Sequence, residues 1–516
     1  MSSSFFNSLK YKTFFFIYIL ILITIVLCDI YPLKSLPAKI KTLRRMHRSL
    51  DKNEEDSFLE NAYGDSYDLN YYYATLYIGS KKIPQTFILD TGSPTTSSPC
   101  DLCQKCGKHL NKPYKLEDKS SIIKCNTDKC NLVRSTTCVD HNCGFSISYS
   151  EGSSLQGIFS MQEVYFEKIN KMPNITKKSY KIPIGCTTKE THLFYTQLAD
   201  GIMGLNNGPK SFVSLLYNNK IISKNLFTIC FGQKDGYFSI GEIDKTYHKT
   251  KIQYVPLIAG ENNFYININK IKVGKTVINN NYRGFVDSGT TISYFPNEIY
   301  NSIINEFNSE CKKYGKKCGD FRDVSGLGYC GFFETVLDKI IAINEYWPNI
   351  TFYFEGHNYI LTGNDYYYDY NENKIGACLG FEGERTMKIT LGGTFMHNHD
   401  IIFDKENQKI GFAVADCNRG NNNNTNNNYT KKYNDITKDK EVGKGMNNNE
   451  NDKDNNKLIS YLINNKFVFY IIIIFSILFL ILILFIIILA LRKCIFKKKH
   501  ITHVDEITNS NNSEKA

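Results

Sequence analysis

Two short stretches decide the fold of this chain: Phe87-Ile-Leu-Asp-Thr-Gly-Ser93 and its echo, Gly284-Phe-Val-Asp-Ser-Gly-Thr290. In each stretch, apolar residues lead directly into an aspartate, a hydroxyl residue and a glycine. A short apolar run that ends at a glycine turn is typical of a buried strand. The sequence therefore predicts that Asp90 and Asp287 stand at the ends of two equivalent strands.

A second pair of motifs extends this repeat. Ile202-Met-Gly204 follows the first aspartate, and Thr390-Leu-Gly392 follows the second. A single Asp-Thr-Gly triplet also makes an ordinary turn, but two triplets that each have a later apolar-apolar-glycine element indicate two similar halves. We expect a pseudo-twofold molecule in which each half contributes one acid to a site at the joint.

Two carboxyl groups side by side suit the hydrolysis of peptide bonds. One carboxylate accepts a proton from water while the other carboxyl donates a proton to the carbonyl oxygen. Like charges held close together cannot both ionise cheaply, so the pair shares one proton and titrates as a unit. Asp90 and Asp287 are therefore the predicted catalytic residues.

The neighbours of each aspartate are predicted to support it. The two glycines allow a tight turn and a close backbone approach. The first hydroxyl after each acid is predicted to hydrogen-bond across the joint, and the hydroxyl at the end of each motif is predicted to support its own acid. These support residues are Thr91, Gly92, Ser93, Ser288, Gly289 and Thr290.

Elsewhere the pattern favours strands. The alternation over Tyr72–Ile78, the turn at Gly79 and the apolar rise over Gln85–Leu89 predict a β-hairpin. Short strands with Gly, Asn and Asp turns continue to about Cys417. Helices are few, with candidates over 297–307 and 334–344.

Two apolar runs frame the chain. Basic residues precede the run Thr13–Cys28, which has the form of a secretory signal peptide; an uncleaved signal anchor is the alternative. The run 467–491 is uncharged and long enough to cross a bilayer. Arg492 and Lys493 follow it, and positive charge marks the cytoplasmic side. We expect a single-pass, type I membrane protein.

These features predict the domain organisation. The segment after the signal reads as a leader or propeptide, and the segment before the membrane run is too rich in Asn, Lys and Asp to build a core. The predicted parts are a signal peptide (1–28), a leader or propeptide (29–66), an N-terminal catalytic lobe (67–255) with a cysteine-rich insert (100–143), a C-terminal catalytic lobe (256–417), an Asn-rich stalk (418–466), a transmembrane helix (467–491) and a cytoplasmic tail (492–516).

The cysteines indicate an oxidising compartment. Fourteen of the sixteen fall between the two apolar runs, an even number, so we expect disulfides. Eight of them, seven in the insert together with Cys186, are predicted to form four disulfides near the segment Tyr149–Ser153. Zinc binding by the first three is the alternative. The fourteen are Cys100, Cys103, Cys106, Cys125, Cys130, Cys138, Cys143, Cys186, Cys230, Cys311, Cys318, Cys330, Cys378 and Cys417.

At this point the sequence resembles the pepsin family of aspartic proteases, over residues 71–417. Tyr149-Ser-Glu-Gly-Ser153 resembles the family's flap, which implies that Tyr149, Gly152 and Ser153 close over substrate. Asp200-Gly-Ile-Met-Gly-Leu205 and Leu391-Gly-Gly-Thr-Phe395 resemble the strands that cross behind the catalytic loops. The cysteine cluster is similar to that of nepenthesin-type enzymes, and most similar to the plasmepsin V group of protist enzymes.

The resemblance implies a mainly β, bilobal, pepsin-like fold and an aspartic-type endopeptidase that acts on polypeptides without a cofactor or a metal. With the apolar runs, it implies a secretory-pathway membrane location, with the endoplasmic reticulum as one candidate. The catalytic domain would be lumenal. Sequons at Asn174, Asn349, Asn423 and Asn428 are candidate glycosylation sites.

Other interpretations compete with this one. A catalytically inactive pepsin-like binding protein is the main alternative, although both Asp-Thr/Ser-Gly triplets are intact; a cysteine-rich receptor is another. The net charge of +11 is spread along the chain and does not predict nucleic-acid binding. His397 and His399 are expected at the surface rather than on a metal, and Tyr366–Tyr370 as a loop or edge strand.

Overall fold

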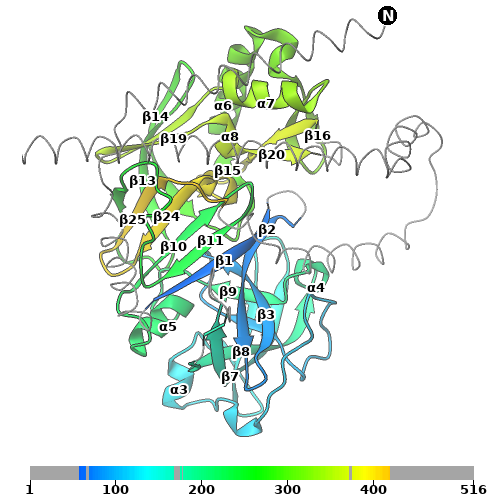
Figure 1. Cartoon of the computed structure of the whole chain (residues 1–516), viewed down its shortest axis with the longest axis vertical. Helices are drawn as coiled ribbons and strands as arrows, with labels where there is room; N and C mark the ends of the chain where they lie inside the picture. Colours follow the sequence, from blue (N-terminus) through cyan, green and yellow to red (C-terminus); the bar gives the residue numbers. More distant parts are fainter. Residues whose placement is uncertain (1–56, 66–68, 168–174, 177, 371–374, 419–516) are drawn as a thin grey trace, which may run out of the picture. The chain divides into compact units, whose positions relative to one another are not determined.

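The structure is a computed structural model that describes residues 57–418, except 66–68, 168–174, 177 and 371–374 (Figure 1). The predicted signal peptide, transmembrane segment and cytoplasmic tail, and nearly all of the predicted stalk, lie outside the described residues. Within the described ranges, no helix is both long and apolar enough to cross a membrane. The predicted mainly β architecture is confirmed.

The largest sheet has the strand order β12-β25-β24-β10-β11-β1-β2-β3-β9-β4-β8-β7-β6-β5. The strands of this sheet are β1 (Phe58–Asp65), β2 (Tyr71–Ile78), β3 (Ile83–Asp90), β4 (Ser97–Pro99), β5 (Thr137–Val139), β6 (Asn142–Ser148), β7 (Ser154–Phe166), β8 (Tyr180–Thr191), β9 (Gly201–Gly204), β10 (Leu226–Phe231), β11 (Lys234–Ile240), β12 (Gln253–Pro256), β24 (His399–Asp404) and β25 (Lys409–Val414).

Two smaller sheets belong to the second half of the chain, in the orders β19-β18-β13-β14-β23-β15-β22 and β16-β17-β21-β20. Their strands are β13 (Tyr265–Val273), β14 (Thr276–Val286), β15 (Ser293–Pro296), β16 (Asp320–Val324), β17 (Gly328–Phe332), β18 (Ile350–Phe354), β19 (His357–Leu361), β20 (Tyr367–Tyr370), β21 (Gly376–Leu379), β22 (Phe381–Glu384) and β23 (Ile389–Leu391).

Short helices cover the ends of these sheets. The described helices are η1 (Lys119–Ser121), α3 (Asp128–Asn131), α4 (Leu193–Thr196), α5 (Phe212–Asn218), α6 (Asn297–Lys312), η2 (Gly315–Cys318), α7 (Val336–Glu345), α8 (Gly363–Tyr366) and α9 (Gly393–Met396). Both helices predicted from the sequence are present, as α6 and α7. The predicted hairpin is present as β2 and β3, which pair antiparallel with Ile78 opposite Ile83 around a glycine turn at Gly79 (φ 77°).

The internal repeat is visible in the way that each aspartate is held. Asp90 is the last residue of β3, which pairs in parallel with β9, and Asp287 directly follows β14, which pairs in parallel with β23. Strand β9 contains the first downstream element, Ile202–Gly204, and β23 contains Thr390 and Leu391 of the second, with Gly392 directly after it. Each acid therefore stands at the buried end of a strand beside an equivalent neighbour, as the duplicated motif predicts.

Two strands pair with strands from outside the predicted domain segment to which they belong. Strand β1 begins at Phe58, inside the segment 29–66 predicted as a leader, and lies between β11 and β2. Strand β24, from the end of the C-terminal segment, pairs with β10 of the N-terminal segment, with Ile229 opposite Ile401. The two chain halves therefore share one sheet, because strand pairing follows spatial rather than sequence neighbours.

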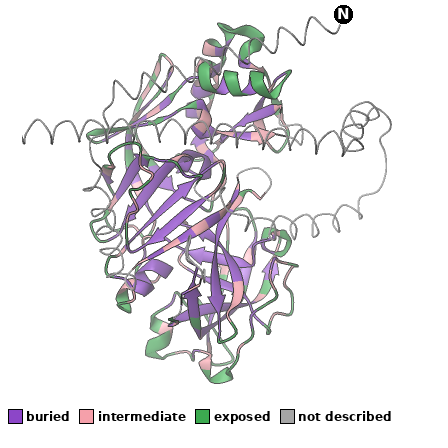
Figure 2. Cartoon of the chain, viewed as in Figure 1, coloured by how far each residue is buried: buried purple, intermediate pink, exposed green. Residues whose placement is uncertain are grey.

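Buried residues form the interior of these sheets (Figure 2). The expectation that His397 and His399 lie at the surface is wrong, because their exposures are 0% and 3%. The Tyr72 hydroxyl lies 3.1 Å from His397 Nε2, and burial lowers the pKa of His397 to about 4. The run Tyr366–Tyr370 ends in β20, an edge strand, as one of the two predicted options.

Candidate active site

The two aspartates lie together at the centre of the described chain. Asp90 is 4% exposed and Asp287 is 8% exposed. A Cβ atom built on Gly92 would lie 2.7 Å from Asp287 Oδ1, and one built on Gly289 would collide with the Asp90 carboxylate. The two glycines are therefore required because each loop passes directly against the acid of the other loop.

Crossed hydrogen bonds join the two loops. The amide of Thr91 donates to Ser288 Oγ at 3.1 Å, and the amide of Ser288 donates to Thr91 Oγ1 at 2.9 Å. Each hydroxyl then donates to the backbone of the opposite strand, Thr91 Oγ1 to the Val286 carbonyl at 3.1 Å and Ser288 Oγ to the Leu89 carbonyl at 2.7 Å. This reciprocal arrangement fixes the separation and orientation of the two loops.

Each carboxylate also accepts two hydrogen bonds from its own loop. The Gly92 amide donates to Asp90 Oδ1 at 2.8 Å, and Ser93 Oγ donates to Asp90 Oδ2. In the second loop, the Gly289 amide donates to Asp287 Oδ1 at 3.1 Å, and Thr290 Oγ1 donates to Asp287 Oδ2 at 2.6 Å. The structure thus brings together all six residues that the sequence predicts as support for the acids.

The electrostatics of the pair follow from this burial. Burial raises the pKa of both aspartates above the usual range, and the charge of Asp287 raises that of Asp90 further, to about 7. The hydrogen bonds from Ser93 and Thr290 act in the opposite direction, since they favour the ionised forms. At neutral or mildly acidic pH the pair can hold one proton between two carboxylates.

Strands β6 and β7 form a hairpin whose turn contains Tyr149. The Tyr149 amide donates to the Ser153 carbonyl at 2.9 Å, and Gly152, at φ 94°, donates back to the Tyr149 carbonyl at 3.0 Å. Burial, and then the charge of Asp90, raises the pKa of Tyr149. The Tyr149 side chain is therefore near enough to the pair of acids for the charge of Asp90 to act on its hydroxyl.

A residue that the sequence analysis did not select supports this tyrosine. Phe194, on α4, is 5% exposed and its ring centroid lies 5.0 Å from that of Tyr149. Gln197 caps the C-terminal end of α4, and its carbonyl oxygen lies 3.1 Å from Nδ1 of His109 in the cysteine-rich insert. His109 also lies 2.9 Å from the Glu190 carboxylate, which raises the pKa of the imidazole. The insert is thereby connected to the helix beneath the flap.

All fourteen cysteines between the apolar runs form disulfides in the structure. Those of the N-terminal half are Cys100–Cys186, Cys103–Cys106, Cys125–Cys138 and Cys130–Cys143, and the others are Cys230–Cys417, Cys311–Cys318 and Cys330–Cys378. The first two disulfides contain all three cysteines of the zinc alternative, so their thiolates are not available to a metal.

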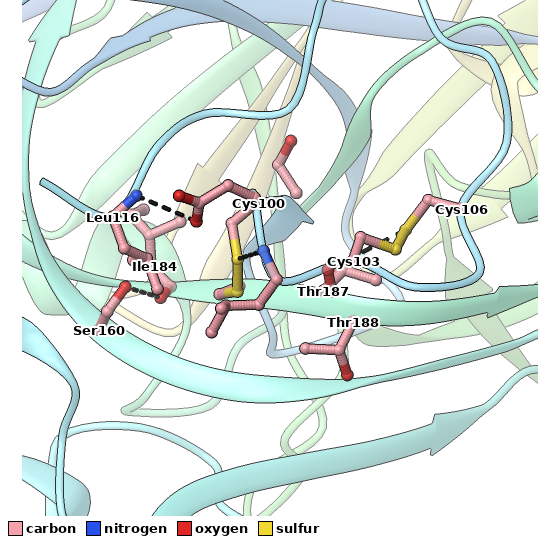
Figure 3. Close-up of a disulfide and its surroundings, with 12 residues drawn as sticks. Cys100, Cys103, Cys106, Leu116, Ser160, Ile184, Thr187 and Thr188 are labelled. Carbon is pink, nitrogen blue, oxygen red and sulfur yellow. Dashed lines mark hydrogen bonds between the residues drawn. A yellow bond between two sulfur atoms is a disulfide. The ribbon is translucent and has the colours of Figure 1, made fainter. Parts of the chain in front are cut away.

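Figure 3 shows Cys100 and the Cys103–Cys106 disulfide of the insert beside Ile184, Thr187 and Thr188 of β8. Cys100 crosses to Cys186 in the middle of that strand, and Cys106 packs against the carbonyl of Thr187. The backbone amide of Gln104 donates to the Thr188 carbonyl at 3.1 Å. The insert is therefore held along β8, the strand that leads to α4. Within the described ranges, no group of three or more His, Cys, Asp or Glu side chains could hold a metal ion.

Comparisons with known proteins agree with this geometry. The sequence model of the family described as eukaryotic aspartyl protease matches residues 71–415. The chain is 27% identical to plasmepsin V of Plasmodium falciparum (isolate 3D7), over 70% of this chain and 74% of that protein. It is 24% identical to aspartic protease 5 of Toxoplasma gondii, over 70% of this chain and 38% of that protein. It is 26% identical to nepenthesin-1 of Nepenthes gracilis, over 67% of this chain and 78% of that protein.

A solved structure shares the fold. Conglutin gamma, described as a unique basic 7S globulin from lupine seeds, matches with a TM-score of 0.54 and 15% identity, over 70% of this chain and 95% of that one. At this identity the likeness concerns the fold alone. Activity must therefore be argued from the pair of aspartates and its surroundings.

Proposed function

The chain belongs to the family of eukaryotic aspartyl proteases, and from this premise we propose that it is an active aspartic endopeptidase with Asp90 and Asp287 as its catalytic residues. The alternative is a pepsin-like binding protein without activity. The crossed hydrogen bonds between Thr91 and Ser288 favour the active protease over the binding protein. A protein that only binds has no need to hold two buried acids in one fixed orientation.

The proposed reaction needs one proton on the pair. A water molecule between the two carboxyls gives a proton to the ionised carboxylate as its oxygen attacks the peptide carbonyl carbon. The protonated carboxyl gives its proton to the carbonyl oxygen, which becomes a hydroxyl on a tetrahedral carbon. When the C–N bond breaks, the nitrogen takes a proton from the pair and leaves as an amine, while one hydroxyl of the tetrahedral carbon returns its proton to the pair as the new carboxyl group forms. No bond forms between enzyme and substrate.

The flap residues are proposed to enclose the substrate over this pair. Tyr149 is positioned by Phe194, and the turn at Gly152 and Ser153 closes the hairpin. Excluding water strengthens the hydrogen bonds made to the tetrahedral species. We propose polypeptides of the secretory pathway as the substrates.

We also propose that the protease is anchored in the membrane by residues 467–491, with its catalytic domain in the lumen and its C-terminus in the cytosol. The support is the apolar run with Arg492 and Lys493 after it, together with seven disulfides, which persist in oxidising compartments.

The test is peptide cleavage by the purified full chain. A peptide library followed by mass spectrometry should give internal cuts, and each cut in ¹⁸O water should place one labelled oxygen in the new carboxyl group. Asp90→Asn and Asp287→Asn should each lower kcat/KM by roughly 10²–10⁴-fold, since either acid alone cannot supply both proton transfers. Asp140→Asn is the matched control, because Asp140 is exposed and has a positive φ that Asn tolerates.

Three results would contradict the proposal. Turnover by Asp287→Asn equal to that of the unchanged chain would remove the catalytic role of the pair. Trapping of an acyl group on the enzyme by hydroxylamine would show a covalent intermediate, which this mechanism excludes. Absence of cleavage by a correctly folded unchanged chain would favour the binding protein.

A further inference from the structure

Helix α7 has an unusual distribution of side chains. Its inner face contains Lys339, which is 4% exposed, beside the buried Ala342 and Ile343. Its outer face carries four aliphatic side chains with exposures of 38–65%: Val336, Leu337, Ile340 and Ile341. Positions i, i+1, i+4 and i+5 form one continuous stripe on a helix. Figure 2 shows α7 exposed over much of its length.

An ordinary surface helix buries its apolar side and exposes its charges. Helix α7 instead buries Lys339 and leaves four of its six apolar side chains exposed. The inward Lys339 is paired with Asp369, and its ammonium group lies 5.9 Å from the ring centroid of Tyr367. The buried charge on the inner face therefore has partners within the fold. Nothing in the described part of the fold covers the outer stripe. An exposed contiguous apolar patch of this kind marks an interaction surface.

The surroundings of the stripe include exposed lysines and a tyrosine, beside the exposed acidic residues Glu334, Asp338 and Glu345. The short helix η2 packs against α7 and is pinned by the Cys311–Cys318 disulfide. Lys312, Lys316 and Lys317 on this segment are exposed, and Tyr314 is 41% exposed and stacks on Tyr346 at the end of α7. Aliphatic side chains flanked by lysines and tyrosine are typical of elements that lie in the interface of a lipid bilayer.

We infer that the α7 surface, defined as the aliphatic stripe with the adjacent lysines and Tyr314, docks on the membrane that holds the chain. The aliphatic side chains enter the boundary between headgroups and acyl chains, and the lysines contact lipid phosphates. The inference rests on the anchor proposed above. Only residues 418–466 separate the catalytic lobes from the proposed anchor in the sequence, so docking of the α7 surface on that bilayer is intramolecular.

Tryptophan fluorescence can test this contact directly. The chain has a single tryptophan, Trp347, which is 4% exposed and supplies a constant background. The full chain with Leu337→Trp is reconstituted into phosphatidylcholine and phosphatidylserine vesicles with brominated acyl chains. The emission added by the substitution should be quenched. The matched control is Ile360→Trp, at a position that is 49% exposed on β19 of the same lobe, and its added emission should be quenched several-fold less.

The lysines give a second, independent measurement. Each lysine near an anionic surface contributes about five-fold to the docking equilibrium, so Lys316→Gln with Lys317→Gln should weaken it about 20- to 30-fold. The loss should disappear in vesicles of phosphatidylcholine alone, and added salt should reproduce it. An unchanged equilibrium on anionic vesicles would contradict the phosphate contacts.

Flotation of the same vesicles separates this inference from the proposed anchor. A chain that floats while the indole at position 337 escapes quenching keeps its anchor and overturns the docking. Equal quenching at positions 337 and 360 would also overturn it, because the bilayer contact would not be specific to α7. A stable dimer that Leu337→Glu converts into monomers would assign the stripe to a second copy instead. A chain that neither floats nor is quenched refutes both proposals.

Discussion

At the scale of single residues, the two hydroxyls beside the acids set how the pair titrates. Ser93 donates to Asp90 and Thr290 donates to Asp287, and both hydrogen bonds favour the ionised carboxylate. Burial acts in the opposite direction and is the larger influence, which leaves the pKa of Asp90 at about 7. Activity needs one shared proton, so it should fall on the alkaline side as that proton is lost.

Ser93→Ala should therefore move the alkaline limb of kcat/KM to higher pH. Loss of a hydrogen bond to a charged group costs about 1.5–3 kcal/mol, which corresponds to a shift of about one to two pH units. Thr290→Ala should act in the same direction through Asp287. The control is Ser120→Ala, which removes a similar Ser–Asp hydrogen bond at the surface of the insert. A limb that moves to lower pH, or moves equally in the control, would contradict this assignment.

At the scale of elements, the flap depends on a helix and an insert that are distant in sequence. The turn between β6 and β7 carries Tyr149, α4 supports it through Phe194, and His109 of the insert contacts the end of α4. A flap tyrosine displaced by about 1 Å can cost about 10²-fold in rate. The cysteine-rich insert is thus a support for the flap as well as a cross-linked surface segment.

Phe194→Leu should lower kcat/KM by about 10- to 100-fold, and Phe194→Tyr should restore most of it because the ring returns. The control is Phe159→Leu, a residue of the same hydrophobic cluster that is 2% exposed and packs on Phe145. The two leucine variants should lose similar thermal stability, but only Phe194→Leu should lose activity. Equal losses of activity would reduce Phe194 to a core residue without a role in the flap.

At the scale of the whole molecule, the first described strand is internal to the largest sheet. Strand β1 pairs with β11 and with β2, and Phe58 stacks on Phe166 with ring centroids 3.8 Å apart. Any leader that is removed in maturation must therefore end before Phe58, since a later cut would take out the strand.

A chain that starts at Ser57 should fold, and one that starts at Ser66 should not. Loss of β1 removes one neighbour from each of β2 and β11 and opens the core around Phe166. Deletion of one buried Phe side chain alone costs about 3–5 kcal/mol, against a typical total of 5–15 kcal/mol. The measurements are the yield of soluble protein with complete disulfides and its melting temperature. Equal melting temperatures for the two chains would show that β1 is dispensable.

Features that depend on short-range patterns could be predicted from the amino-acid sequence. The repeated Asp-Thr/Ser-Gly motif predicted both acids and their six supports, and alternation of apolar residues predicted the β2–β3 hairpin. Helices α6 and α7 were also found, because their apolar period lies within a few turns. The even number of cysteines between the apolar runs predicted disulfides but left their pairing open.

Features that depend on contacts between distant residues could be seen only in the folded chain. Cys186 pairs with Cys100 because β8 lies beside β4, and nothing in the spacing of eight cysteines selects that pairing. His397 is buried because β10 and β2 pack around it, and Phe194 supports Tyr149 because β7 and β8 bring them together. A local pattern records which face of an element is apolar; which partner covers that face is settled when the strands pair.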